Sequence, residues 1–555
     1  MEKRVLLAVI LSVAVMYGYS LIFPPAKPPT TAPAGPAQGS VSSAARLTAQ
    51  PAAAPVPAVA PILPATPAAA AAQEVTVETD LYRAVFTSQG AALTRFVLKN
   101  YRDVPGTAGK PVVLVQESRP ERASLRVAAP GFGLDPGALY AVSQPSLTLS
   151  GGQQGALTFT TVTPTGEQVR KVFSFVGNSY GIGLDLQVAN GTVQPRSGEL
   201  VISLVNRAGD GKEQGQFDVL GPVTLAGDKL DNVPVKDLAK GEKSYAKDIL
   251  WTGFGDKYFL SALLKGGAAG TGSDIGGVRV TKEEGYVLTR IATVPASVAP
   301  GQSVSLPFRL FFGPKDLHVL KVQGEQLEKA LDLGWFSALA MPLLQSLNFF
   351  YRYIPNYGIA IIIITVILKI LFFPLTHKSY KSMKEMQKLQ PKMQQLKEKH
   401  KNDRDAMNRE VMELYKTHKV NPLGGCLPMV VQIPVFFALY KALMYSIELR
   451  HAPFYGWITD LAAKDPYYVT PILMGASMVI QQKMTPSAGM DPMQQKMMMA
   501  LPVVFTFMFL NFPSGLVLYW LVNNILTIAQ QLYINKSVNV EPPAAPALAG
   551  GGKKR

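Results

Sequence analysis

A lysine, Lys369, lies inside the run Gly358 to Leu375, which is otherwise apolar and long enough to span a membrane as a helix. A charge at bilayer depth costs roughly 2.5 to 3.5 kcal/mol on insertion scales, so a lysine there usually faces water, a partner or a substrate. The alternative is that the side chain snorkels toward polar residues at the end of the run, Thr376 and His377. The rest of the chain has to decide between these interpretations.

Composition indicates a membrane protein with an attached soluble domain, because the 555 residues are 48% hydrophobic and the apolar residues are gathered in patches. Residues 1–23 contain a basic flank, Lys3 and Arg4, followed by an apolar run, and no A-x-A cleavage site follows directly. We predict a signal anchor with its N-terminus in the cytoplasm. Residues 24–73 are mostly Pro, Ala, Gly, Ser and Thr, which is typical of a linker.

The segment 74–331 has a different texture, with short alternating runs such as EVTVETDLYRAVF broken by Gly, Asn, Pro and Asp turns. This pattern predicts a large all-β sandwich domain. Residues 332–350 predict an amphipathic helix on the outer membrane surface, with Phe336, Leu339, Leu343 and Leu347 on one side. Five further apolar spans follow, and with the anchor they make six: 351–375, 421–447, 467–483, 497–512 and 513–534.

The distribution of Lys and Arg among the short loops predicts the orientation of the chain in the membrane. The segment 376–420 carries twelve basic against six acidic residues and predicts a helical hairpin, whereas the loop 448–466 has only Arg450 and Lys464. We therefore place 376–420, the loop 484–496 and the basic tail 535–555 in the cytoplasm and the β domain outside. Anionic lipid headgroups or the RNA-rich ribosome surface suit these charges better than a specific DNA site.

Polar side chains recur at helical spacing within the apolar spans. Thr365 shares the face of Lys369, the span 421–447 contributes Gln432, and Ser477 and Gln481 lie on one stripe. The last span has a stripe of its own, made of Tyr519, Asn523 and Thr527 with Trp520 and Asn524 beside it. Such stripes either bond to one another in a dry bundle or line a wet cavity. Since the apolar runs hold no Asp or Glu in their interior between 358 and 534, an unpaired lysine favours the wet cavity.

No enzymatic motif is present: the sequence lacks GxxxxGK[ST], HExxH, G-x-S-x-G and Cys/His metal spacing. We expect no enzyme activity, no cofactor and no metal site. The one cysteine, Cys426, can form no internal disulfide and is interpreted as a small apolar filler.

Four runs closely resemble the bacterial inner-membrane insertases of the YidC/Oxa/Alb family: NPLGGCLPMVVQIPVFFALYKAL (421–443), DPYYVTPILMG (465–475), DPMQQKMMMALPVVFTF (491–507) and FPSGLVLYWLVNN (512–524). The resemblance implies a five-helix core around a hydrophilic groove, with one basic residue in its second span, here Lys369. Many Gram-negative members have arginine at that position, and lysine keeps the charge without the planar fork. Trp520 likewise stands where a tyrosine is familiar. The implied partners are nascent membrane proteins, the ribosome, the Sec translocon and lipids.

The resulting hypothesis is a membrane protein insertase that acts alone or with the Sec translocon and assists folding and assembly of its substrates. An acidic tail enters the groove toward Lys369, while the apolar helix leaves past Phe436, Met498 and Phe505. Two alternatives stay open: a secondary transporter for a small anion, and a carbohydrate-binding enzyme tethered to the membrane. The transporter should show internal repeats, and none is found. The tethered enzyme should lose its function when the β domain is deleted.

Overall fold

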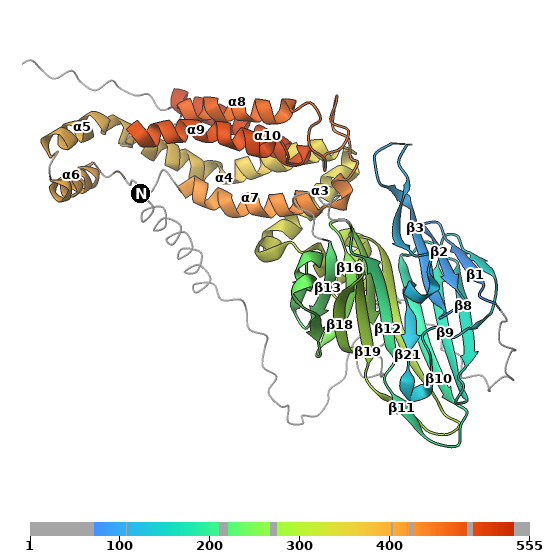
Figure 1. Cartoon of the computed structure of the whole chain (residues 1–555). Coiled ribbons are helices and arrows are strands. Elements are labelled where there is room, and N and C mark those ends of the chain that lie inside the picture. Colours follow the sequence, from blue (N-terminus) through green and yellow to red (C-terminus); the bar gives the residue numbers. More distant parts are fainter. Residues whose placement is uncertain are drawn as a thin grey trace, which may run out of the picture. The chain divides into compact units, whose positions relative to one another are not determined.

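The computed structural model describes residues 71–537, except 107, 210–219, 267–274, 401–402, 419, 421–426 and 485–491. The predicted anchor 1–23, nearly all of the linker, Cys426 and most of the basic tail lie outside the described residues. Within the described residues the strands run from Glu74 to Pro314, and helices make up most of the chain that follows (Figure 1).

The β-rich domain contains two large sheets among its described residues. The five-stranded sheet has the order β4 (Pro111–Gln116), β3 (Ala92–Arg102), β2 (Tyr82–Thr87), β1 (Glu74–Glu78) and β7 (Ser146–Thr148). The main path of the fourteen-stranded sheet has the order β5 (Arg126–Ala128), β12 (Val201–Arg207), β19 (Tyr286–Thr293), β18 (Ile275–Glu283), β16 (Ile249–Gly255), β17 (Phe259–Lys265), β21 (Ser303–Pro314), β10 (Gly181–Asn190), β9 (Glu167–Val176), β8 (Gln154–Val162) and β6 (Ala141–Val142). Strands β13 (Gly221–Ala226), β14 (Lys229–Asn232) and β15 (Lys243–Tyr245) lie off this path, and β11 (Arg196–Gly198) pairs with β20 (Ala296–Val298).

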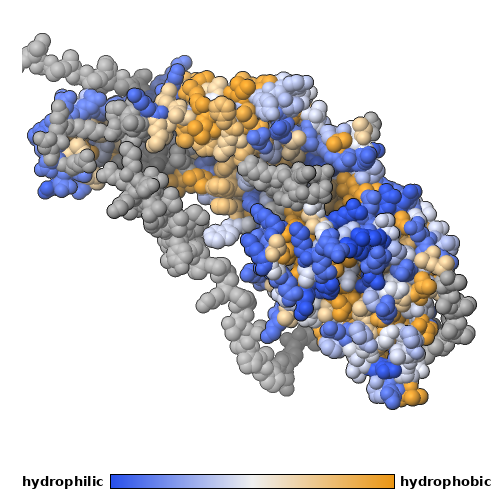
Figure 2. Space-filling view, viewed as in Figure 1, coloured by the Kyte–Doolittle hydropathy of each residue, from blue (hydrophilic) through white to orange (hydrophobic). Residues whose placement is uncertain are grey.

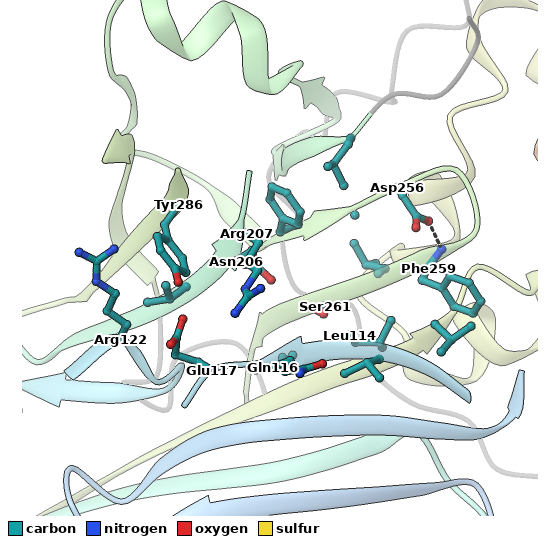
Figure 3. A pocket seen from close by; sticks show the side chains of 18 residues that line it. Leu114, Gln116, Glu117, Arg122, Asn206, Arg207, Asp256, Phe259, Ser261 and Tyr286 are labelled. Carbon is teal, nitrogen blue, oxygen red and sulfur yellow. Dashed lines mark hydrogen bonds between the residues drawn. The ribbon is translucent and has the colours of Figure 1, made fainter. Parts of the chain in front are cut away.

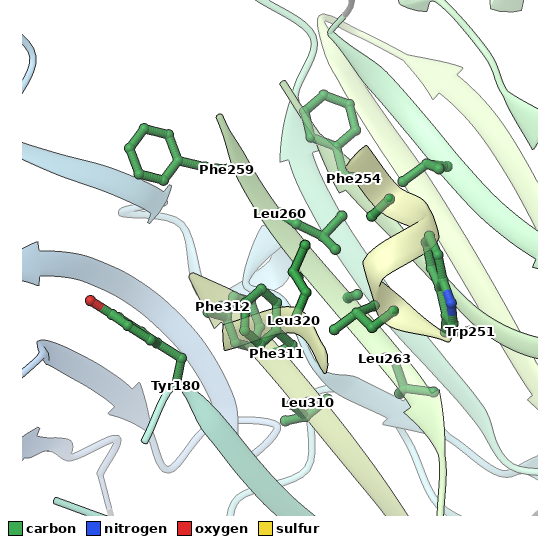
Figure 4. Packing of buried hydrophobic residues seen from close by; sticks show 14 of the residues in the cluster. Tyr180, Trp251, Phe254, Phe259, Leu260, Leu263, Leu310, Phe311, Phe312 and Leu320 are labelled. Carbon is green, nitrogen blue, oxygen red and sulfur yellow. The ribbon is translucent and has the colours of Figure 1, made fainter. Parts of the chain in front are cut away.

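Aromatic side chains join the two sheets. Phe86 of β2 lies with its ring centroid 4.8 Å from that of Phe173 on β9, and Phe96 of β3 stacks 5.0 Å from Phe312 on β21. Alternate residues of β10 are buried, as expected for a strand with one face in a core. The core continues through Phe311, Leu310 and Trp251 (Figure 4). The alternating pattern in the sequence thus produces two sheets that pack face to face.

The charged side chain of Lys171 lies fully buried within this core. Its Nζ donates to the carbonyl oxygens of Gly90 at 3.0 Å, Ala91 at 2.7 Å and Leu125 at 2.6 Å. Three acceptors match the three donors of an ammonium group, so the hydrogen-bonding cost of burial is largely offset. Because Lys171 belongs to β9 and Gly90 and Ala91 connect β2 to β3, this side chain ties one sheet to the other.

A short helix, α2 (Leu317–Gln323), and a 3-10 turn, η4 (Leu327–Leu331), follow the last strand. Helix α3 (Ser337–Tyr353) then begins five residues later than the predicted start at 332. It buries Ala340, Leu344 and Leu347, while Leu339 is 45% exposed. Of the predicted apolar face, Leu347 is thus buried against neighbouring helices and Leu339 is exposed, and the location of this face on the membrane surface stays a prediction. Helix α3 packs against both α4 and α7, and its buried side also includes the small residue Ala340.

The helical region contains α4 (Tyr357–Lys388), α5 (Gln390–Lys399), α6 (Arg404–Thr417), α7 (Leu427–Tyr445), α8 (Val469–Met484), α9 (Pro492–Phe509) and α10 (Ser514–Ser537). Helix α10 packs against α8 and α4, and α9 packs against α8. The α8–α9 contact depends on Gly475, since a Cβ there would lie 2.0 Å from Oγ1 of Thr506. Helices α3, α4, α7, α8, α9 and α10 thus pack into the bundle drawn in yellow to red in Figure 1.

Helix α4 continues without a break to Lys388, well beyond the end of the predicted span at 375. Pro391 stands in the first turn of α5, where its missing N–H costs nothing. The first helix of the predicted hairpin is consequently divided between the end of α4 and α5. Helices α5 and α6 contact each other, and His400 Nε2 lies 2.9 Å from Glu410 Oε1.

The surface of the bundle is rich in exposed apolar side chains (Figure 2). These include Ile370 and Leu371 on α4, Ile433 and Phe437 on α7, Ile472 and Leu473 on α8, and Val504 and Phe507 on α9. Helix α4 is the one described helix that meets both the length and the hydropathy expected of a membrane span, and two shorter apolar helices cover Val430–Tyr445 and Lys496–Phe509.

Candidate functional site

Lys369 of α4 lies against α10. Its Nζ donates to Oγ1 of Thr527 at 2.7 Å, and that hydroxyl donates in turn to the carbonyl oxygen of Asn523 at 2.6 Å. Thr527 is 6% exposed, whereas Lys369 is half-buried. No ion pair in the described part of the chain includes Lys369. The ammonium group is therefore held by a neutral hydroxyl and keeps donors for a further acceptor.

Two more hydrogen bonds connect α10 to its neighbours. Gln432 of α7 donates from Nε2 to the Tyr519 hydroxyl at 2.9 Å. On the other side, Asn524 donates from Nδ2 to Oγ of Ser477 on α8 at 3.1 Å, and Ser477 donates to the Met474 carbonyl at 2.6 Å. Polar side chains of the apolar helices therefore meet across three helix pairs, α4–α10, α7–α10 and α8–α10.

The other predicted polar residues take different positions. Thr365 is 1% exposed, and its hydroxyl donates to the carbonyl of Ile361 within the same helix at 2.7 Å. Gln481 on α8 is half-buried. Asn523 takes part through its backbone carbonyl, which accepts from Thr527. The residue that the sequence placed only beside the stripe, Asn524, makes the bond to α8. Successive residues of a helix point about 100° apart, so Asn524 can face α8 although it lies beside the predicted stripe and not on it.

The predicted apolar path gathers around Trp520. Its indole ring lies 4.7 Å from Phe436 in an edge-to-face arrangement and 6.1 Å from Phe505. A third ring, Phe509, lies 5.0 Å away. Met498 is half-buried on α9. An aromatic cluster from α7, α9 and α10 thus adjoins the polar bonds of α10.

Comparisons with known proteins bear on this arrangement. Residues 74–346 match the family model of the YidC periplasmic domain, and residues 349–541 match that of the 60Kd inner membrane protein. The membrane protein insertase YidC of Geobacter metallireducens is 58% identical over 540 residues, which cover 97% of this chain and 99% of that protein. The chain belongs to the YidC family of membrane protein insertases.

Further relatives agree. The membrane protein insertase YidC of Geotalea uraniireducens is 56% identical over 543 residues, which cover 97% of this chain and 100% of that protein. The family is one of inner-membrane proteins with a periplasmic β-rich domain and a helical C-terminal region, and its members are insertases.

Two solved structures are also similar. A crystal structure of an active YidC insertase with its first transmembrane domain resolved covers 83% of this chain and 92% of its own, with a TM-score of 0.36 and 18% identity. A galactose mutarotase-like protein from Lactobacillus casei covers 43% of this chain and 100% of its own, with a TM-score of 0.31 and 12% identity. At these TM-scores neither likeness supports an argument about the site.

Proposed function

We propose that this insertase accepts the hydrophilic tail of a newly made membrane protein in a wet groove beside Lys369. The groove shortens the low-dielectric path that a polar tail must cross, which lowers the cost of translocation without nucleotide hydrolysis. An acidic tail is drawn to the ammonium group, and the membrane potential adds about 2.3 kcal/mol per charge per 100 mV in the direction that favours outward movement of acidic tails.

The bond between Lys369 and Thr527 is the observation that carries this proposal. A snorkelling lysine would extend its amine toward the end of its helix. This amine instead bonds across to α10, one helical turn from Asn523, whose carbonyl accepts from the same hydroxyl. The described residues provide no carboxylate to neutralise it. A cation with free donors among polar side chains is suited to an incoming anionic group.

The substrate's apolar helix leaves along α7 and α9 in this account. Phe436 and Phe505 already contact Trp520 at the edge of the polar bonds, and Met498 stands half-buried on α9. Thioethers and aromatic rings accept apolar partners of varied shape. Burial of the released helix in lipid supplies the driving force.

The finer topology belongs to the same proposal. Six spans with both termini in the cytoplasm would place the basic segment 376–420 and the tail on the cytoplasmic side, where ribosomes and anionic lipids are found. The apolar surface of the helices supports a lipid-facing bundle. Cooperation with the Sec translocon would occur through surfaces outside the polar bonds described above.

Reconstitution tests the function. The purified full chain is placed in liposomes, a single-span substrate with an acidic N-terminal tail is added, and protease protection of that tail is scored against empty liposomes. Wild type should protect the tail, and Lys369→Gln should lose most of this protection. The matched control is Lys441→Gln on α7, which also removes one lysine from an apolar run but whose amine lies over the Tyr445 ring at 4.7 Å.

Equal protection by wild type and empty liposomes would favour the small-anion transporter or the tethered enzyme instead. If Lys369→Gln and Lys441→Gln behave alike, insertion does not depend on the charge beside Thr527.

A further inference from the structure

Two charged side chains of the β-rich domain show how a charge is compensated within this chain. Both line a cleft of about 300 Å³ between the two sheets (Figure 3). Arg122 forms an ion pair with Glu284, and Oδ1 of Asp256 accepts from the backbone N–H groups of Tyr258 and Phe259 at 2.7 Å each. The protein itself therefore supplies the partner of each of these charges.

The amine of Lys369 differs, because its partner in the described part of the chain is neutral. Its Nζ donates to Oγ1 of Thr527 at 2.7 Å. An ammonium group has three N–H donors, and this bond uses one of them. A charge at bilayer depth is costly unless it is paired or faces water. The remaining donors are therefore suited to an anionic partner from outside the chain.

Lys369 lies at the border of an exposed apolar surface of α4. Ile367, Ile370 and Leu371 stand within two residues of it and are 46%, 68% and 67% exposed. Contiguous exposed apolar surface of this kind marks a membrane or protein contact. Lys369 itself is half-buried, so a molecule that lies on this surface can reach its side chain. In a bilayer that molecule is a lipid.

The cytoplasmic end of the apolar run is also close to Lys369. The run ends at Leu375, six residues later, which is roughly 9 Å along the helix at 1.5 Å per residue. Between them, the Phe373 ring lies 6.5 Å from the ring of Tyr533 on α10, and Tyr533 is 63% exposed. Tyrosine is typical of the membrane–water interface. A lysine side chain spans much of the remaining depth, so the headgroup region is within its reach.

These surroundings define the chemistry of the ligand. Phosphate oxygens form charge-assisted hydrogen bonds with an ammonium group, and acyl chains cover exposed isoleucine and leucine side chains. Basic sites between membrane helices on the cytoplasmic side bind anionic headgroups. An anionic phospholipid brings both features. Inorganic phosphate lacks the chains, and phosphatidylcholine already carries a cation beside its phosphate.

We propose that the phosphate of an anionic phospholipid binds the amine of Lys369 when no substrate is present, and that an acidic substrate tail displaces it. The lipid site stands on the contacts of Lys369 alone, whereas the displacement rests on the function proposed above. Exchange of one anion for another keeps the lysine compensated before and after the tail enters the groove.

Photo-crosslinking of the full chain in phosphatidylcholine nanodiscs tests the lipid site. The probe is phosphatidylglycerol with a diazirine in its headgroup, the comparison is phosphatidylcholine with the same diazirine, and mass spectrometry locates the labelled peptides. Labelling of α4 and α10 around Lys369 and Thr527 should be about fivefold stronger with phosphatidylglycerol, a preference that one lysine near an anionic headgroup supports. Equal labelling by the two probes would overturn the lipid site.

Competition identifies the anion on wild type, whether or not any variant folds. Unlabelled phosphatidylglycerol should reduce the labelling, and inorganic phosphate at the same concentration should leave it unchanged. Equal competition by both would mean that a free anion rather than a lipid occupies the amine, which contradicts the proposal.

Variants locate the labelled site. Lys369→Gln should lose the preference for phosphatidylglycerol, and Lys369→Arg should keep it because the charge remains. The matched control is Lys441→Gln, which should behave like wild type, since the amine of Lys441 lies over the Tyr445 ring at 4.7 Å. A preference that persists in Lys369→Gln would place the lipid elsewhere and contradict the assignment.

A substrate tests the displacement. Labelling around Lys369 should fall when a single-span substrate with an acidic tail is added and should persist with a basic tail of the same length. Labelling that also persists with the acidic tail would overturn the displacement and leave the lipid site standing. Insertion that depends on the charge of Lys369 without any preference for phosphatidylglycerol would overturn the lipid site and leave the proposed function standing.

Discussion

The amine of Lys369 and the hydroxyl of Thr527 meet at 2.7 Å although 158 residues separate them in the chain. Thr527 accepts from the lysine and donates to the carbonyl of Asn523, so one hydroxyl both joins α4 to α10 and directs the ammonium group toward the polar stripe. The position of the charge is thus fixed by a neighbour that carries no charge itself. A neutral partner does not compensate the positive charge, as the proposed recognition of an acidic tail requires.

Removing the hydroxyl should weaken insertion without removing the charge. Thr527→Val keeps the shape of the side chain but eliminates the acceptor, so the amine is free to turn away. We expect insertion of an acidic-tailed substrate to fall about fivefold, which corresponds to roughly 1 kcal/mol for one lost hydrogen bond. Protease protection in proteoliposomes measures this. Thr527→Ser should retain most of the activity, and equal loss in both variants would show that packing rather than the hydroxyl is responsible.

The bond between Gln432 and Tyr519 should couple α7 to α10 energetically. Tyr519→Phe and Gln432→Leu each remove one partner, and a double-mutant cycle on thermal unfolding in nanodiscs isolates their interaction. The expected coupling is about 0.6 kcal/mol, the average for hydrogen bonds between membrane helices. Additive effects of the two substitutions would mean that the bond contributes nothing to stability.

Sequence periodicity predicted the existence of the elements better than their bounds. The alternating runs led to a two-sheet domain whose first strand begins at Glu74, because alternation by two residues directly reflects a half-buried strand. The predicted membrane span ended at 375, where the apolar run ends, and a helical hairpin was expected to follow. Helical hydrogen bonding does not depend on hydropathy, and one helix, α4, continues from the apolar run through polar residues to Lys388.

The partners within the bundle were harder to predict than its polar residues. Helical spacing put Thr365 on the face of Lys369, yet Thr365 bonds to its own backbone, and Thr527 of a distant helix holds the lysine. Spacing gives the faces of one helix but not the rotation of its neighbour. The buried Lys171 was not predicted at all, since its surroundings depend on strands brought together by long-range pairing.

The stability of the β-rich domain should rise with pH because of Lys171. Burial and the nearby Arg126 lower the pKa of this lysine from 10.5 to about 7, although its three carbonyl acceptors favour the charged form. Between pH 7 and 10.5 the unfolded chain therefore binds more protons than the folded chain, and the free energy of unfolding increases with pH. Calorimetry should show that the free energy of unfolding of wild type, relative to that of Lys171→Met, increases from pH 7 to 10.

The exposed Lys229 provides the control for this measurement. The difference in free energy of unfolding between wild type and Lys229→Met should stay constant over the same pH range. A constant difference between wild type and Lys171→Met would contradict a lowered pKa at Lys171.

Asp465 should fix the start of α8. It is 2% exposed, and its carboxylate accepts from Trp457 Nε1 at 3.0 Å, Tyr467 N at 2.9 Å, and Thr470 N and Oγ1 at 2.8 and 2.7 Å. Asp465→Asn replaces one acceptor oxygen by a donor, and we expect a loss of about 1 to 3 kcal/mol. Faster hydrogen exchange at the Thr470 amide of Asp465→Asn would show this loss of stability. Unchanged exchange would mean that other contacts hold the start of the helix.

The stability of the start of α8 should depend on pH through the same carboxylate. Burial alone would raise the pKa of Asp465, but its hydrogen bonds, led by those from Thr470, hold the pKa below its usual range. Its contribution is therefore complete above the ordinary pKa and is lost as the pH falls through the lowered value. Protection of the Thr470 amide in wild type should decline below about pH 4, and Asp465→Asn should show no such decline.

The central claim is that the charge at Lys369 acts on the charge of the substrate tail. The most direct measurement compares insertion of two substrates that differ only in their tails, one acidic and one basic, by wild type and by Lys369→Glu in the same liposomes without a membrane potential. We expect wild type to favour the acidic tail and Lys369→Glu to reverse the preference. A ratio of acidic to basic insertion that is the same for both proteins would show that Lys369 does not recognise the tail.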